Sequence, residues 1–331
     1  MPSETLQYDV LAGMEEFVGK QLPLLKSVED SWQPSDFLPE TNSENWHDGI
    51  ADLRKKAATL SDEVLVVLTG NIVTEEALPS YQTWLNRVQG LKDETGASLA
   101  SWGRWTRGWT AEEKRHGDLL SKYLYLSGRV DMHTVEVTVQ NLIRNGFDLK
   151  SDNDPYKSIV YASFQERATK ISHANTGILA EKCGDSTLSK MCAAIAGDEA
   201  RHEEAYKRFF TFVLSGDPDR AMIAFAYMMR KKIAMPARLM SDGTDRDLFS
   251  QFAVVAQRSG VYTIRDYADV IQHLVDYWHI GSFTGLSEEA ERSQEYLCGL
   301  AQSYLAKAER VEELISNLPK EPFLWIFDRS V

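Results

Sequence analysis

Two short stretches, far apart in the chain, carry the same residue types at the same spacing. Glu112–His116 and Asp198–His202 both consist of an acidic residue followed by Glu-x-Arg-His. Residues three apart share one face of an α-helix, so the Glu-x-x-His in each stretch can hold a metal ion from a single helix. Two such helices, with one further glutamate from each of two others, form the two-metal site of a four-helix bundle. The repeated motif therefore predicts a two-metal centre.

The helical faces that carry these motifs are otherwise apolar. At steps of three and four residues, the first face comprises Trp105, Trp109, Glu113, His116, Leu120 and Leu124, and the second comprises Cys192, Ile195, Glu199, His202, Tyr206 and Phe209. A buried carboxylate or imidazole is costly unless it is paired or binds a metal. A single Glu-x-x-His is more often a surface ion pair, but two copies on apolar faces favour metal ligands.

Other glutamates could complete the centre. Glu166 shares a helical face with apolar residues such as Ile159 and could be a single inward carboxylate. Nearer the N-terminus, Glu75 and Glu76 are adjacent, and Pro79 is expected to interrupt or restart the helix because proline lacks the amide hydrogen. Spacing alone leaves the choice between Glu75 and Glu76 open.

The acidic residue in front of each motif also has a predicted role. A metal-bound histidine usually donates its other ring N–H to a carboxylate, which fixes the tautomer. If the two motif helices face each other antiparallel, Asp198 orients His116 and Glu112 orients His202. The alternative is that both acidic residues are surface charges. Trp109, on the first motif face, is assigned to the surroundings of the centre or to electron transfer, against a purely structural place in the core.

The composition is ample for a large core, and no low-complexity linker divides the chain, so one domain is expected. The chain has 331 residues, 43% of them hydrophobic, and a net charge of −13, which argues against broad nucleic-acid binding. Its three cysteines form no C-x-x-C pair, which argues for a reducing compartment. No apolar run approaches the ~20 residues that cross a bilayer, so no membrane insertion is expected.

The hydrophobic periodicity predicts helices throughout, and therefore an all-α fold. Besides the motif helices, we expect helices over Glu4–Lys20, Asp48–Thr59, Val64–Leu78, Ala221–Met240, Asp247–Ser259, Ile264–Trp278 and Glu288–Ser316. Ser61 is the expected cap of the third of these, and the apolar tail Pro322–Phe327 is expected to dock. The single domain, 1–331, is divided into N-terminal helices with a turn segment (1–60), a metal-binding bundle core (61–215) and C-terminal helices (216–331).

Several long stretches also carry a resemblance to a known family. They are Trp32–Pro39, Ile72–Gln82, Asp93–Ser98, Trp105–Met132, Ser163–His173, Asp198–Tyr206, Met228–Pro236, Ala253–Tyr267 and Trp325–Arg329. Through them the chain resembles the plant-type soluble acyl-[acyl-carrier-protein] desaturases, the stearoyl-acyl-carrier-protein desaturase family. The stretches are specific and cover nearly the whole chain.

The resemblance implies a homodimer with a ferritin-like four-helix bundle core, additional packed helices and a non-haem centre of two irons per chain. Its ligand pattern falls on Glu75, Glu113, His116, Glu166, Glu199 and His202. It places Thr169 on the oxygen-binding side, and Trp32, with Asp198 and His116, on a path for electrons to the iron. Hard oxygen donors favour oxidised iron, so carboxylate-rich ligation suits this chemistry.

The resemblance also implies the reaction. The enzyme would use O2 and electrons from reduced ferredoxin to introduce a cis double bond, at the delta-9 position, into a saturated chain of sixteen to eighteen carbons on acyl carrier protein, in fatty acid biosynthesis. The alternative is another ferritin-like di-iron oxidase, or a radical-generating or iron-handling protein, because one ligand set serves several functions.

Two further sets of residues follow from the resemblance. The acyl-channel positions are Trp84, Arg87, Val88, Leu149, Ser158 and Ile159. Trp84 replaces an expected methionine and Ser158 an expected glycine, so both are expected to shorten or reshape the cavity.

Acyl carrier protein is acidic, and docking on a chain of net charge −13 requires a local basic patch. Arg230, Lys231 and Lys232 are predicted to form it, with Lys26 and Arg201 as neighbours; the alternative is a solvated helix end.

The N-terminus has neither a signal nor a basic transit peptide, so a bacterial cytoplasm is expected, with the mature plastid-stroma form as the alternative.

Overall fold

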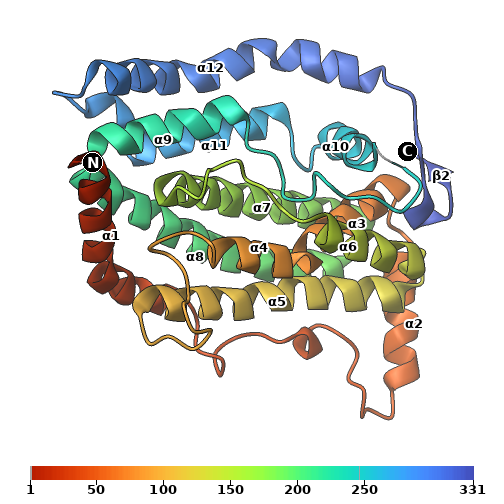
Figure 1. Cartoon of the computed structure of the whole chain (residues 1–331). Coiled ribbons are helices and arrows are strands. Elements are labelled where there is room, and N and C mark those ends of the chain that lie inside the picture. The colour runs from red at the N-terminus through yellow and green to blue at the C-terminus, as the bar shows by residue number, and fades with distance from the viewer. Residues whose placement is uncertain (1, 246) are drawn as a thin grey trace.

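The structure, a computed structural model, describes residues 2–245 and 247–331 and is built from stacked helices (Figure 1). In this view α5 (Ser101–Ser127) lies along one side of the molecule and α12 (Glu288–Ser316) along the opposite side. Between them α7 (Pro155–Cys183) and α8 (Ser186–Gly216) pack against each other. The predicted all-α fold is confirmed.

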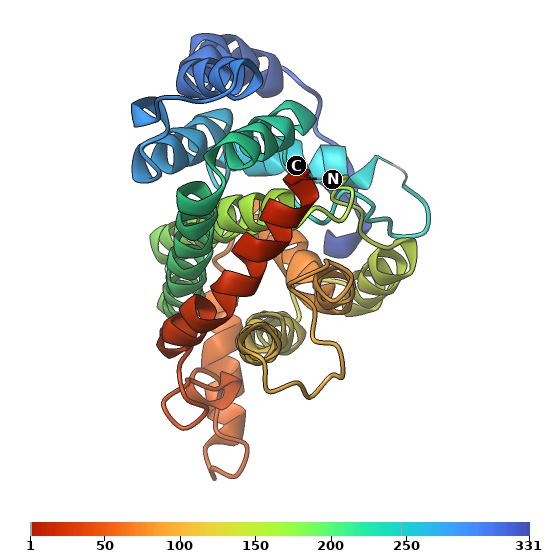
Figure 2. The same cartoon turned by 60° about the vertical axis from the view of Figure 1, so that its left-hand side comes forward.

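The other helices are α1 (Pro2–Gln21), α2 (Trp46–Ala57), α3 (Asp62–Glu76), α4 (Leu78–Leu85), α6 (Met132–Asn145), α9 (Pro218–Lys231), α10 (Leu248–Ser259) and α11 (Ile264–Tyr277). Short 3-10 turns lie at Leu22–Leu24, Pro34–Asp36, Ile280–Ser282 and Leu324–Ile326. Two short antiparallel strands, β1 (Pro322–Phe323) and β2 (Arg329–Ser330), follow α12. Helix α1 crosses over α5 and α8 (Figure 2).

Local signals set the ends of the helices that carry the metal-ligand candidates. The Ser61 hydroxyl accepts the Val64 N–H at the start of α3, as predicted, and Asp154 and Asp185 cap α7 and α8 in the same way. Such a cap contributes about 1 kcal/mol. Gly128 ends α5 in the left-handed region, with φ of 66°, where a side chain would be strained.

The helix is interrupted between α3 and α4, as the position of Pro79 led us to expect. Helix α3 ends at Glu76 and α4 begins at Leu78, with Pro79 in its first turn. Proline is tolerated there because a first-turn N–H has no helical partner. Trp84 therefore lies on a different helix from Glu75, and the break sets the angle between the two side chains.

One predicted helix is shorter than expected. The apolar pattern over 221–240 predicted a single helix, but α9 ends at Lys231, and Lys232 has φ of 58°. Pro236 prevents a helix that continues to Met240, because its ring would clash with the Lys232 carbonyl, and the positive φ of Lys232 ends α9 one turn earlier. The segment that follows α9 is irregular, and it buries Ile233, Ala237 and Met240.

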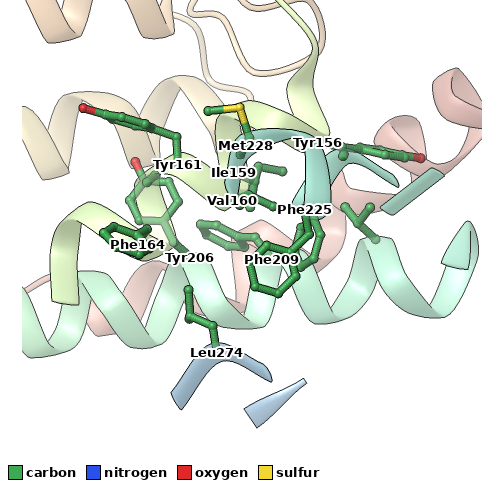
Figure 3. Packing of buried hydrophobic residues seen from close by; sticks show 14 of the residues in the cluster. Tyr156, Ile159, Val160, Tyr161, Phe164, Tyr206, Phe209, Phe225, Met228 and Leu274 are labelled. Atoms are coloured by element: carbon green, nitrogen blue, oxygen red, sulfur yellow. The ribbon is translucent and has the colours of Figure 1, made fainter. Parts of the chain in front are cut away.

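The core consists of two clusters of buried side chains, one mainly around α7, α8 and α9 and one around α3, α5 and the C-terminal tail. In the first, Val160, Phe209 and Phe225 gather between the helices (Figure 3). The tail docks as predicted, since Trp325 is fully buried and its indole N–H donates to Thr138 Oγ1 at 2.9 Å.

The division into three regions of one domain stays a prediction.

No single described helix has both the length and the apolar character to cross a membrane, although the bent pair Trp46–Ala57 and Asp62–Leu85 meets those two requirements together.

Gly70 tests the packing of α3. A Cβ at this position would lie 2.1 Å from the ring of Phe252 on α10, so we expect Gly70→Ala to lower the free energy of unfolding by about 1–3 kcal/mol, measured by urea denaturation. Gly299, in open space on α12, is the matched control, because Gly299→Ala should be neutral or stabilising by up to ~1 kcal/mol. Equal stability of the two variants would contradict the close approach of α3 and α10.

Candidate metal centre

Six buried side chains from four helices converge on one place. They are Glu75 on α3, Glu113 and His116 on α5, Glu166 on α7, and Glu199 and His202 on α8. They form two overlapping groups of four, and within each group the potential ligand atoms lie within 4.8 Å of one another. Glu113 and Glu199 belong to both groups, so two ions there would share two carboxylates. Glu76 belongs to neither group, and its carboxylate lies against Gly117.

The atoms that face this space have no other partner. Glu113 Oε1, Glu199 Oε2 and the Nδ1 atoms of His116 and His202 are buried without a hydrogen bond. His202 Nδ1 and Glu113 Oε1 are 2.8 Å apart, but they are not aligned as a hydrogen bond. Buried polar atoms are rarely left unpaired, and carboxylate oxygens with imidazole nitrogens suit iron. The donor set therefore fits a pair of iron ions.

Charge repulsion within the group points to the same requirement. Burial raises the pKa of Glu75 and, strongly, that of Glu166, and the neighbouring carboxylates add to both shifts. Burial alone would lower the pKa values of His116 and His202, but the surrounding carboxylates raise both well above the usual value. These opposite shifts of carboxyls and imidazoles share one cause, which is the crowding of carboxylates at a buried site, and bound cations would offset that negative charge.

The predicted cross-pairing of the motifs is present. His116 Nε2 lies 3.4 Å from Asp198 Oδ2, and His202 Nε2 lies 3.0 Å from Glu112 Oε2. Arg201 donates to both Glu112 and Asp198. Burial would raise the pKa values of these two carboxyls, but hydrogen bonds from the histidines and Arg201 lower both to about 2. Both are therefore charged at neutral pH, which makes them strong acceptors for an imidazole N–H.

The two single glutamates are held by different donors. Trp109 Nε1 donates to Glu166 Oε1 at 3.1 Å, which places Trp109 beside the centre as the sequence predicted. His173 Nε2 lies 2.8 Å from Glu75 Oε1. His173 was not predicted to lie at the centre, but its position two turns after Glu166 on α7 was a usable signal.

The segment between α1 and α2 also reaches the centre. The Trp32 ring stacks on His116, with centroids 6.0 Å apart and ring planes at 14°. Arg115 donates to the Trp32 carbonyl and to Asp198, and its guanidinium covers the Trp32 ring. No role was predicted for Arg115, although an arginine precedes the histidine in both motifs.

Two predicted docking residues lie at the carboxylates of the centre. Arg201 bonds to Glu112, Asp198 and the Leu24 carbonyl, and the Lys26 amide N–H donates to Glu112 Oε1 at 2.7 Å. The Lys26 ammonium lies 3.9 Å from Asp198. The guanidinium of Arg201 is therefore engaged by carboxylates of the protein itself, whereas Arg230, Lys231 and Lys232 are exposed around the end of α9.

An inner cavity of about 70 Å³ opens beside the centre. Its walls include Glu75, Glu113, Glu166, Glu199 and Thr169 on one side and aromatic side chains on the other. The Thr169 hydroxyl lies within hydrogen-bond distance of the carbonyls of Gln165 and Glu166. Thr169 thus lines the same cavity as four of the candidate ligands.

Two surface grooves adjoin the inner cavity. The basic groove, about 350 Å³, shares Phe147, Tyr161 and Pro236 with it and is lined by Lys150, Lys231, Lys232 and Arg238. The outer groove, about 780 Å³, shares Trp84 and Phe147 with it. Lys150 and Arg238 were not predicted to belong to the basic docking patch, because they come near Lys231 only through folding.

The predicted channel residues divide into two sets. Trp84 lines the inner cavity, and Arg87 and Leu149 line the outer groove. Val88, Ser158 and Ile159 are buried but line none of the three spaces. The Ser158 hydroxyl donates to the Asp154 carbonyl, one turn earlier in α7.

A cluster of ion pairs lies behind the centre on α7, α8 and α11. The Glu203 carboxylate is buried and contacts Arg167, Lys170, Lys207 and His273. Burial alone would raise the pKa of Glu203, but His273 and the cations lower it well below its usual value. The cluster therefore depends on a charged Glu203.

A helical bundle that brings two Glu-x-x-His motifs and two single glutamates to one buried site defines the class of ferritin-like di-metal carboxylate proteins. The solved X-ray structure of DesA2 from Mycobacterium tuberculosis has a similar fold, with a TM-score of 0.56 over 86% of this chain and 99% of that chain. The two sequences are 18% identical, so this likeness concerns the fold alone.

Sequence comparison identifies the family within this class. The family model described as fatty acid desaturase matches residues 6–327, and the chain belongs to that family. It is 52% identical to stearoyl-[acyl-carrier-protein] 9-desaturase 1, chloroplastic, of Arabidopsis thaliana, over 100% of this chain and 84% of the relative. It is also 50% identical to the acyl-[acyl-carrier-protein] 6-desaturase of Thunbergia alata, over 94% of this chain and 80% of that relative.

Glu203 provides a test of the electrostatics around the centre. Glu203→Gln removes the buried carboxylate that Arg167, Lys170 and Lys207 share, so we expect a loss of about 3 kcal/mol in the free energy of unfolding of the metal-free protein. Because the folded-state pKa of Glu203 is lowered, its stabilisation is present above the unfolded-state value of about 4.3 and is lost as the pH falls through the folded-state value.

Glu288→Gln is the matched control, since the Glu288–Arg292 pair is exposed and should contribute less than ~1 kcal/mol. Urea denaturation at neutral pH and near pH 4 measures both variants. The assignment fails if Glu203→Gln is no less stable than Glu288→Gln at neutral pH.

Proposed function

We propose that this chain is an acyl-[acyl-carrier-protein] desaturase. It introduces a cis double bond at the delta-9 position into a saturated acyl chain of sixteen to eighteen carbons, with O2 as co-substrate, in fatty acid biosynthesis. The observation that carries the proposal is the buried six-residue group beside an aromatic-walled cavity, in a chain that belongs to the fatty acid desaturase family. The relatives named 9-desaturases support the delta-9 position, and the relative named a 6-desaturase is the competing case.

The proposed cofactor is a pair of iron ions per chain. The ligands would be Glu75, Glu113, His116, Glu166, Glu199 and His202. Iron supplies the reduction of O2 and the removal of hydrogen from unactivated methylene groups. Overall, one O2, two external electrons, two protons and two hydrogens of the acyl chain give one double bond and two waters.

The side chains around the centre position the reactants. Trp109 contacts one carboxylate oxygen of Glu166, and His173 contacts one of Glu75. The second oxygen of each glutamate is left free for a metal. Asp198 and Glu112 accept from the Nε2 atoms of the histidines and so direct the Nδ1 lone pairs inward. The apolar walls of the inner cavity exclude water and hold a chain without polar groups beside these atoms.

Electrons would come from reduced ferredoxin through Trp32, which stacks on His116 and contacts Arg115. The proposed assembly is a homodimer. The proposed compartment is a bacterial cytoplasm, with the plastid stroma as the alternative that the chloroplastic relatives support. A radical-generating function is the alternative activity, because Tyr206 lines the inner cavity one turn after His202.

Iron content tests the centre directly. Glu113→Ala and Glu199→Ala each remove a carboxylate from both groups, so we expect bound iron to fall from two per chain to none, measured by elemental analysis, while the helical circular dichroism is retained. Glu75→Ala and Glu76→Ala are a matched pair of neighbours. The first should lose iron and the second should keep it. Full iron content in Glu75→Ala or Glu113→Ala would refute the ligand assignment.

Salt dependence tests the docking site. Lys231 and Lys232 line the basic groove, so the double charge reversal Lys231→Glu/Lys232→Glu should raise KM for acyl carrier protein substrates about tenfold at low salt and leave kcat unchanged. The dependence of KM on ionic strength should weaken as well. Lys55→Glu/Lys307→Glu changes the net charge equally at exposed sites and should have little effect. If the wild-type KM does not respond to salt, electrostatic docking is wrong.

A further inference from the structure

A fourth space, here called the side pocket, adjoins the centre at the break between α3 and α4. It has a volume of about 270 Å³, and its polar wall includes Glu75, Glu76 and Lys114. Helix α4 runs alongside α5 at this place (Figure 1). Among the described residues, Glu75 alone lines both the side pocket and the inner cavity. One candidate ligand therefore stands between the side pocket and the centre.

The carboxylate of Glu76 in this pocket is not engaged by the protein. Glu76 is half-buried, and within the described part of the chain its carboxylate makes neither a hydrogen bond nor an ion pair. A Cβ at Gly117 would lie 3.0 Å from Glu76 Oε1 and 3.3 Å from the carbonyl carbon of Glu75. The carboxylate thus rests on the backbone of the residue that follows His116, where any side chain would displace it. It is held beside two of the helices that carry ligands.

The position of Glu75 and Glu76 along α3 is unfavourable by itself. Both lie in the last turn of α3, which contains no basic residue. The C-terminal end of a helix carries a partial negative charge, so carboxylates are disfavoured there and cations are favoured. Conflicts of this kind between a local rule and the sequence tend to remain at functional sites. A cation in the side pocket relieves the repulsion.

Three other approaches to the centre each carry at least three cationic side chains. These are Lys26, Arg115 and Arg201 at the segment between α1 and α2, Lys150, Lys231, Lys232 and Arg238 in the basic groove, and Arg167, Lys170 and Lys207 behind α8. The first and third sets already engage the nearby carboxylates of Glu112, Asp198 and Glu203. The side pocket instead has two carboxylates and one ammonium, that of the exposed Lys114. Among these approaches, it therefore attracts a free cation most strongly.

We propose that the side pocket is the entrance through which divalent metal ions reach the centre, with Glu76 as the first carboxylate to bind the ion and Glu75 as the next. This inference rests on the metal centre of the proposed function and is independent of the acyl substrate. Carboxylate oxygens suit the divalent ions of the first transition row. An ion on Glu76 lies one residue from a ligand that also lines the inner cavity. The adjacent glutamates thus have different roles, one on the path and one at its end.

The kinetics of metal exchange test the entrance. The metal-free full chain is mixed with Co²⁺, whose visible absorption reports its ligation, and release from the cobalt-loaded protein to an excess of chelator is followed separately. For Glu76→Gln we expect uptake and release to slow by similar factors of about tenfold, with two metals per chain still bound at saturation. Both directions change together because a group on the path alters the barrier and leaves the end states alike.

Lys114 supplies the opposite sign. Lys114→Gln removes the ammonium that repels the ion, so uptake should become about two- to threefold faster. Glu94→Gln and Lys55→Gln are the matched controls, because they remove the same charges at exposed sites outside the side pocket. Their uptake and release rates should equal those of the wild type. Glu76→Asp keeps the charge and should retain most of the wild-type rate.

Unchanged exchange rates in Glu76→Gln would overturn the entrance, and so would faster uptake in Lys231→Gln/Lys232→Gln alone, which would move it to the basic groove. Fewer than two metals per chain in saturated Glu76→Gln would make Glu76 a ligand and overturn its role on the path. A wild type that binds no metal would overturn the entrance and the centre together. A wild type that binds two metals and desaturates no acyl carrier protein substrate would refute only the proposed activity, since the exchange rates test the entrance without turnover.

Discussion

The burial of four carboxylates and two imidazoles in one place is the constraint on which the rest of the structure depends. Such a group is unstable in an apolar interior unless cations neutralise it. The inward atoms of Glu113, Glu199, His116 and His202 face one another and make no hydrogen bond. The buried carboxylates therefore lower the stability of the folded chain, and the packing of α3, α5, α7 and α8 compensates for that cost and keeps the ligand atoms in place.

Around that group the repeated motif also places a ring of ion-paired side chains, formed by Glu112, Asp198, Arg115 and Arg201. Each motif supplies an acidic residue that binds the other motif's histidine, and an arginine that binds those acidic residues. The ring is nearly symmetric, but the two single glutamates are not held alike. An imidazole holds Glu75 and an indole holds Glu166, and an indole can only donate. The two halves of the centre therefore differ in their surroundings although their ligands match.

The sequence predicted what depends on local periodicity. The apolar faces of α5 and α8, the cap at Ser61, the break at Pro79 and the docking of the tail are all present. It could not place residues whose neighbours come from elsewhere in the chain. Phe147 and Lys150 lie in a loop with no periodicity, and their roles depend on α4, α7 and the segment after α9. The family resemblance assigned Ser158 and Ile159 to the acyl channel, but the orientation of α7 buries both in the core.

The segment between α1 and α2 connects the centre to the surface through three backbone contacts. The Leu24 and Trp32 carbonyls accept from Arg201 and Arg115, and the Lys26 N–H donates to Glu112. All three partners also hold the histidines or their carboxylates. Thermodynamic linkage then works in both directions, so whatever orders this segment tightens the centre by the same free energy with which a filled centre orders the segment. The segment thus forms a direct mechanical link between the surface of the protein and the residues that position both histidines.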